Sequence, residues 1–185
     1  MVEKIIIDIN YKDYQKLAYQ RKNALEKHIL IANPDDYVSS IITYNNKKLR
    51  SKIRLKGDWM DHLKSDMWSY RVKITGNQTL FGMKKFSIQK PSVRHQPYDF
   101  TFQSLVRDTG GIAPFHKFAH IIVNGVDWGV MDIEEHMSKE LLEKQNRKES
   151  IIVSFFNDSK WIYLQKSKLP YSGYRPSDPF IFLNL

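Results

Sequence analysis

Three short runs of sequence decide the fold: KIRLKG at residues 52–57, WSYRVKI at 68–74 and KKFSIQ at 84–89. Each run alternates apolar and polar side chains with a period of two, which is typical of a strand with one face on a core. The side chains expected to face inward are Ile53, Leu55, Tyr70, Val72, Ile74, Phe86 and Ile88. Those expected on the other face are Arg54, Lys56, Arg71, Lys73, Lys85, Ser87 and Gln89.

If the three strands are neighbours, five cations share the outer face of one sheet. Cations held this close repel one another, so the pattern predicts an anion that offsets them. A solvated, lysine-rich outer face or a protected sheet edge explains the same residues without a ligand.

The overall charge also favours an anionic partner. The chain has 29 Lys and Arg against 20 Asp and Glu, a formal charge of +9, which suits a phosphorylated ligand, nucleic acid or a membrane surface. The basic residues are spread along the chain rather than gathered in one arm, which argues against nucleic acid.

The length of 185 residues predicts one domain, or one domain with an appendage. The absence of cysteine excludes disulfides, thiolate zinc sites and cysteine nucleophiles. No apolar run approaches the roughly 20 residues of a spanning helix, so we expect a soluble chain with no transmembrane segment.

The remaining elements are expected on both sides of the three runs. Residues 1–50 predict a strand (4–10), a helix (13–28) and a hairpin that begins with a strand at 37–44. Residues 51–156 continue with a helix (99–108), two strands (116–123 and 126–134) joined by an Asn-Gly turn, a helix (139–147) and a strand-like run (151–156). Residues 157–185 hold one more strand-like run (161–164) and then an irregular tail. This order predicts an α+β fold with a mainly antiparallel sheet and two to three helices.

Several polar and aromatic groups allow both a structural and a functional interpretation. His62 with Asp58, Asp61 and Asp66 suits a metal or acid–base cluster, although polar loops of this composition are usually only loops. Trp59, Trp68 and Trp128 suit stacking of bases or sugars, but anchoring a core or loop is the commoner role of tryptophan.

The element order is that of a protein-kinase small lobe, and the residues resemble the CotH family, atypical kinases named after a spore-coat protein. The matching pieces are RLKGDW at 54–59, WSYRVK at 68–73, FGMKKFS at 81–87, GGIAP at 110–114, VNGVDWG at 123–129 and EEH at 134–136. None is decisive alone, and their joint order and spacing carry the resemblance.

The resemblance implies an ATP site, with Mg²⁺, on the small lobe. Its phosphates would lie on the basic face of Arg54, Lys56, Arg71, Lys73 and Lys85, beside a loop that starts at Gly57. Lys85 would take the place of the kinase small-lobe lysine, with Lys73 as a competitor, and Asp99 would be its carboxylate partner. The backbone at Glu135 and His136 would meet the adenine.

The resemblance also implies an incomplete enzyme. Kinases carry their catalytic and metal-binding carboxylates in a large lobe, and only 50 residues follow Glu135. We therefore expect the ATP-binding small-lobe portion of a kinase for protein or another surface substrate, with no assignable catalytic residue and no transfer by this chain alone.

The alternative is a non-enzymatic structural or interaction module of a bacterial envelope or spore coat, the location that the resemblance implies. A nucleic-acid module that uses the basic sheet, with Trp59 and Trp68 as stacking platforms, is a third possibility.

Overall fold

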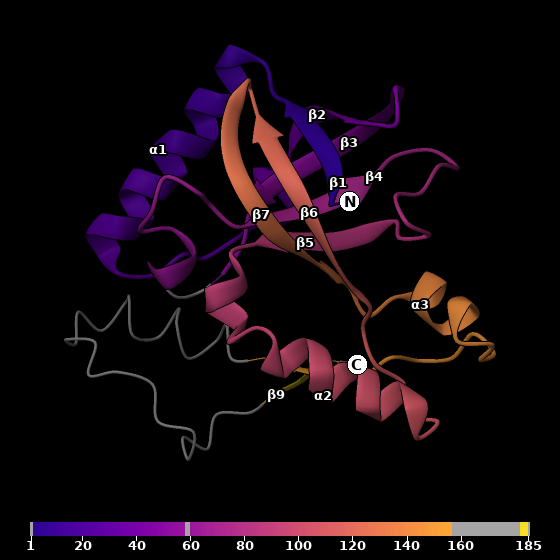
Figure 1. Cartoon of the computed structure of the whole chain (residues 1–185). Helices are drawn as coiled ribbons and strands as arrows, with labels where there is room; N and C mark the ends of the chain where they lie inside the picture. The colour runs from indigo at the N-terminus through magenta and orange to yellow at the C-terminus, as the bar shows by residue number, and fades with distance from the viewer. Residues whose placement is uncertain (1, 58–59, 157–181, 185) are drawn as a thin grey trace.

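The computed structural model describes residues 2–57, 60–156 and 182–184, which form a β-barrel, flanking helices and a separate two-stranded sheet (Figure 1). The strands are β1 (Glu3–Asp8), β2 (Val38–Tyr44), β3 (Lys47–Leu55), β4 (Tyr70–Ile74), β5 (Lys85–Gln89), β6 (His116–Val123), β7 (Val126–Glu135), β8 (Ser154–Phe156) and β9 (Phe182–Asn184). The α-helices are α1 (Tyr11–Lys27), α2 (Tyr98–Asp108) and α3 (Lys139–Lys144). Short 3₁₀ turns are η1 (Pro34–Asp36), η2 (Met60–His62) and η3 (Pro91–Arg94).

The barrel closes in the order β1-β2-β3-β4-β5-β7-β6 because β1 pairs along both of its edges. It runs antiparallel to β2, with Ile5 opposite Tyr44, and parallel to β6, with Ile5 opposite Ile121. The turn between β6 and β7 holds the end of β1, since the Asn124 side-chain oxygen accepts a 2.8 Å hydrogen bond from Ile9 N.

The expected fold class, a mainly antiparallel sheet resembling a kinase small lobe, is therefore wrong. The sheet is a closed mixed barrel, and its two outermost strands are joined by the parallel β1–β6 pair. Closure uses up the strand edges that an open sheet leaves free.

The inward face of the three central strands is as the alternation predicts. Ile53, Leu55, Tyr70, Val72, Ile74, Phe86 and Ile88 are all buried in one core. Trp68 and Trp128 are also buried there and pack against Tyr70, so these two tryptophans have the structural role. Helix α1 lies alongside the barrel and buries Leu17 and Ala24 against it (Figure 1).

Helix α2 contacts β6 through the Phe100 ring, which packs against Phe118, and through the Asp99 carboxylate. None of its residues is buried, and Phe102 and Leu105 stay exposed. The preceding η3 segment binds β7 through Arg94 and Gln96, which donate hydrogen bonds to Glu134 and Asp132.

The structure covers most, but not all, of the sequence-based assignments. The run at 161–164, most of the tail, Asp58 and Trp59 lie outside the described residues. No helix of the described part is both long and apolar enough to cross a membrane.

Candidate anion-binding site

The strand register brings the predicted cations together on the outside of the barrel. Arg54 on β3 lies directly opposite Arg71 on β4, and Lys73 lies opposite Lys52 on one side and Lys85 on the other. Like charges directly opposite on neighbouring strands destabilise a sheet, by about 0.2–1 kcal/mol for a typical pair. Stable sheets avoid like charges on directly opposite residues, and here three like-charged pairs lie next to one another. A local departure of this kind is expected at a functional site.

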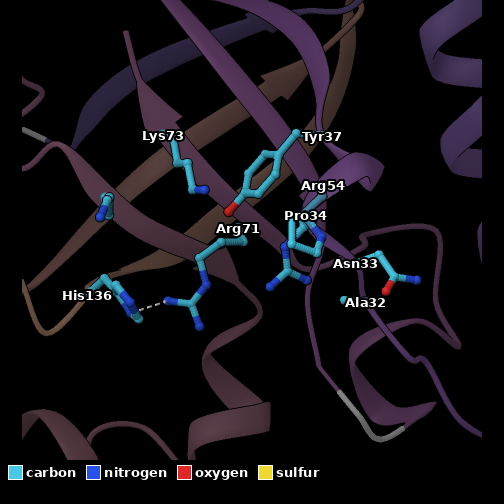
Figure 2. A pocket seen from close by; sticks show the side chains of 9 residues that line it. Ala32, Asn33, Pro34, Tyr37, Arg54, Arg71, Lys73 and His136 are labelled. Carbon is cyan, nitrogen blue, oxygen red and sulfur yellow. Dashed lines mark hydrogen bonds between the residues drawn. The ribbon is translucent and has the colours of Figure 1, made fainter. Parts of the chain in front are cut away.

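A pocket of about 400 Å³ opens on this face (Figure 2). Its floor is formed by strand residues, and its wall comes from the segment between α1 and β2. The lining residues are Ala32, Asn33, Pro34, Tyr37, Arg54, Arg71, Lys73, Lys85 and His136. The described lining therefore contains two arginines, two lysines and no carboxylate.

Tyr37 holds two of these cations in place. Its ring centroid lies 4.1 Å from the Lys73 ammonium and 5.4 Å from the Arg54 guanidinium carbon, both within cation–π range. Figure 2 shows the ring between these two side chains. Tyr37 therefore orients positive charge, and the attraction offsets part of the repulsion among the cations.

His136 reaches the same pocket from the end of β7. Its Nδ1 lies 2.8 Å from Nη1 of Arg71, which donates the hydrogen bond (Figure 2). Burial and the nearby Arg71 and Lys85 lower the pKa of His136 to about 4. The imidazole is therefore neutral at pH 7, and it orients Arg71 as a hydrogen-bond acceptor without adding charge.

Lys56, another predicted phosphate ligand, belongs instead to a buried ion-pair network. Its Nζ lies 2.9 Å from Oε2 of Glu134 and 2.5 Å from Oε1 of Gln89, while Arg94 reaches Oε1 of Glu134 at 2.7 Å. Two cations lower the pKa of Glu134 to about 2 despite its burial. Burial lowers the pKa of Lys56 to about 8. The Glu134 carboxylate raises this pKa, but the nearby Arg94 and Arg71 lower it and so offset part of that effect.

Asp99 and Glu135 are also placed away from their expected roles. Asp99 approaches His116, with 3.7 Å between Oδ2 and Nε2, and no ion pair joins it to Lys85 among the described residues. The buried Glu135 carboxylate pairs with Lys144 on α3 at 3.2 Å, and burial raises its pKa. Neither residue lines the pocket.

Gly57 lies directly against the ring of His62. Gly57 has φ +100°, and a Cβ added there would overlap the ring of His62, which forms a 2.9 Å hydrogen bond with Ser69 Oγ. Burial lowers the pKa of His62 to about 4. Within the described residues, no group of three His, Asp or Glu side chains has the arrangement of a metal site.

We expect Gly57→Ala to destabilise the protein by about 2 kcal/mol, from the left-handed φ together with the clash with His62. Gly76→Ala is the matched control, because Gly76 has φ +73° but nothing lies within 4 Å of its added Cβ. Gly76→Ala should destabilise the protein by about 1 kcal/mol, because only the left-handed backbone conformation opposes the new side chain. Equal losses of urea midpoint in the two variants would contradict this account of Gly57.

Sequence reasoning found Arg54, Arg71, Lys73 and Lys85, and it missed Tyr37 and the His136 side chain. The sequence pattern places Tyr37 at the start of a strand, and the Asn-Pro-Asp-Asp turn before it is the one sign that this segment leaves the sheet. Arg94 and Glu134 were not expected to interact, since 40 residues separate them in the sequence.

No protein-family model matches the chain, and a search of curated proteins likewise gives no match. The resemblance to the CotH family therefore stays a prediction from the motifs quoted above.

Proposed function

We propose that this chain is a binding domain for a phosphorylated small ligand, held in the pocket between Tyr37 and the cations of β3, β4 and β5. One observation carries the proposal: four cations converge on a pocket whose described lining has no carboxylate. Guanidinium groups match the geometry of phosphate oxygens, and a charge-assisted hydrogen bond is roughly twice as strong as a neutral one.

The charge balance around the pocket supports this choice over a merely solvated face. Among the described residues, Arg54, Arg71, Lys73 and Lys85 form no ion pair, whereas the nearby Lys56 and Arg94 share Glu134. Glu134, which lies near enough to Arg71 to interact with its charge, is thus already paired with two other cations. A bound anion would relieve the repulsion that the cross-strand pairs leave uncompensated.

The resemblance to CotH kinases suggests a nucleoside triphosphate as the phosphorylated ligand. The cations suit its phosphates, but the described lining offers no carboxylate oxygen that would bind Mg²⁺. We therefore propose binding as the function of this chain and assign no phosphoryl transfer to its residues. An envelope or coat interaction module without a ligand remains the alternative.

Calorimetric titration with ATP, with and without Mg²⁺, tests the proposal. We expect binding by the wild type, and about tenfold or greater weakening in Lys73→Ala and in Lys85→Ala, because each change removes one phosphate-facing charge. Lys48→Ala is the matched control, since Lys48 is an exposed residue of β3 that does not line the pocket. No heat and no thermal shift at millimolar ATP would overturn the proposal and favour the interaction module.

A further inference from the structure

The backbone that would have to recognise a base beside the pocket is already hydrogen-bonded within the fold. The Glu135 amide donates to the Phe115 carbonyl at 2.8 Å, and the His136 amide donates to the Lys85 carbonyl at 3.0 Å. Both donors would have to break these bonds to meet a base, and a donor that loses its partner in a buried position is costly. The end of β7 is therefore a poor place for base recognition.

The pocket also lacks a free stacking surface. Tyr37 is the one aromatic carbocycle among the described lining residues, and its ring is engaged by Lys73 and Arg54. The His136 ring is held by its hydrogen bond to Arg71. The apolar part of the described lining is small, with Ala32 and Pro34 as its aliphatic members. A purine would thus find neither a stacking partner nor an apolar slot.

The number and spacing of the cations suit a chain of phosphates better than a single one. Arg54 and Arg71 are paired across β3 and β4, while Lys73 and Lys85 are paired across β4 and β5. Directly opposite residues of an antiparallel pair have Cβ atoms about 4.5–5.5 Å apart, so the four charges extend over more than one phosphate group. The volume of about 400 Å³ is at the lower end of the roughly 300–1,000 Å³ range of small-ligand pockets.

We infer that this pocket recognises a run of at least two adjacent phosphate groups and makes no specific contact with a base. The inference rests on the proposed function and names its ligand class, a compact polyphosphate that is either inorganic or the phosphate chain of any nucleotide. Tyr37 is a positioning residue of this pocket, because its ring holds Lys73 and Arg54 in place.

A comparison of ligands at fixed ionic strength and without Mg²⁺ tests this inference by calorimetry. We expect inorganic tripolyphosphate to bind at least as tightly as ATP, and ATP and GTP to agree within about threefold, since the base adds little free energy. Orthophosphate should bind about tenfold or more weakly than tripolyphosphate, and adenosine should not bind.

The Tyr37→Leu variant separates the two possible roles of the ring. A ring that only positions cations should, when removed, weaken tripolyphosphate and ATP by the same factor. A ring that stacks on a base should, when removed, weaken ATP and leave tripolyphosphate unchanged, which would overturn the inference.

The outcomes distinguish the inference from the proposed function. ATP that binds about tenfold tighter than both tripolyphosphate and GTP would overturn the inference and leave phosphate binding intact. Orthophosphate as tight as tripolyphosphate would likewise overturn the requirement for adjacent phosphates. Absence of binding by every phosphorylated ligand would overturn both.

Discussion

Replacement of Arg71 by methionine is expected to lower the affinity for tripolyphosphate by about a hundredfold. Arg71 lines the pocket, lies opposite Arg54 across the strands and is fixed by the 2.8 Å hydrogen bond to His136. A hydrogen bond to a charged partner contributes about 1.5–3 kcal/mol, and 1.4 kcal/mol is tenfold in the dissociation constant. Because Arg71 forms no ion pair with a described carboxylate, its removal should not unfold the barrel, and a thermal melt checks this.

Two controls show whether the loss comes from the guanidinium itself. Arg71→Lys keeps the charge but not the planar fork, so its affinity should lie between those of wild type and Arg71→Met. Lys48→Met makes the same loss of charge on an exposed position of β3 outside the pocket and should change affinity by less than about twofold. Equal effects of Arg71→Met and Lys48→Met would mean that net charge, and not this pocket, attracts the ligand.

The outward face of the central strands could be predicted because alternation fixes which side chains share a face. Arg54, Arg71, Lys73 and Lys85 meet for that reason. Alternation does not say which edges pair, and the parallel contact of β1 with β6 joins Ile5 to Ile121 across most of the described chain. The kinase-like order of elements was therefore compatible with a different, closed topology.

The rest of the site escaped prediction because it depends on strand pairing and on irregular segments. Lys56 points to the outward face, as alternation predicts, but the pairing of β7 with β5 places Glu134 on the same face, opposite Ser87. Tyr37 comes from the connection after η1, whose position over the strands no periodicity encodes. Arg94 reaches Glu134 from the η3 segment, which loops back over β7.

Glu134→Ala is expected to cause the largest loss of stability, about 3–5 kcal/mol, because it leaves the Lys56 ammonium buried without its carboxylate. The Lys56 and Glu134 side chains are 10% and 15% exposed, so water cannot replace the partner well. Arg94 is 40% exposed and can turn to solvent. In a protein of this length the change should lower Tm by about 6–20 °C.

A double-mutant cycle identifies the pair as the cause. Lys56→Met combined with Glu134→Leu removes both charges, so the double variant should be more stable than the sum of the two single losses predicts. Simple additivity of the two losses in urea melts would contradict a direct interaction between these side chains.

Acid should weaken the wild type more than Glu134→Gln. The folded pKa of Glu134 is lowered from 4.5 to about 2 by Lys56 and Arg94. A carboxylate with a lowered folded pKa contributes stability that is fully present above the unfolded pKa and is lost as pH falls through the folded one. The wild type should therefore lose on the order of 3 kcal/mol between pH about 4.5 and about 2, and the variant, which has no carboxyl group at position 134, should lack this component.

Lys56 gives the Glu134→Gln variant a pH dependence of its own, in a higher pH range. Its pKa is already lowered to about 8 by burial, and removal of the Glu134 charge lowers it further. The unfavourable buried ammonium then loses its proton at a lower pH than in the wild type, so the stability of Glu134→Gln should begin to rise at a lower pH than that of the wild type, which rises only near pH 8. Parallel stability curves of the two proteins from pH 6 to 8 would show that Glu134 does not hold the charge of Lys56.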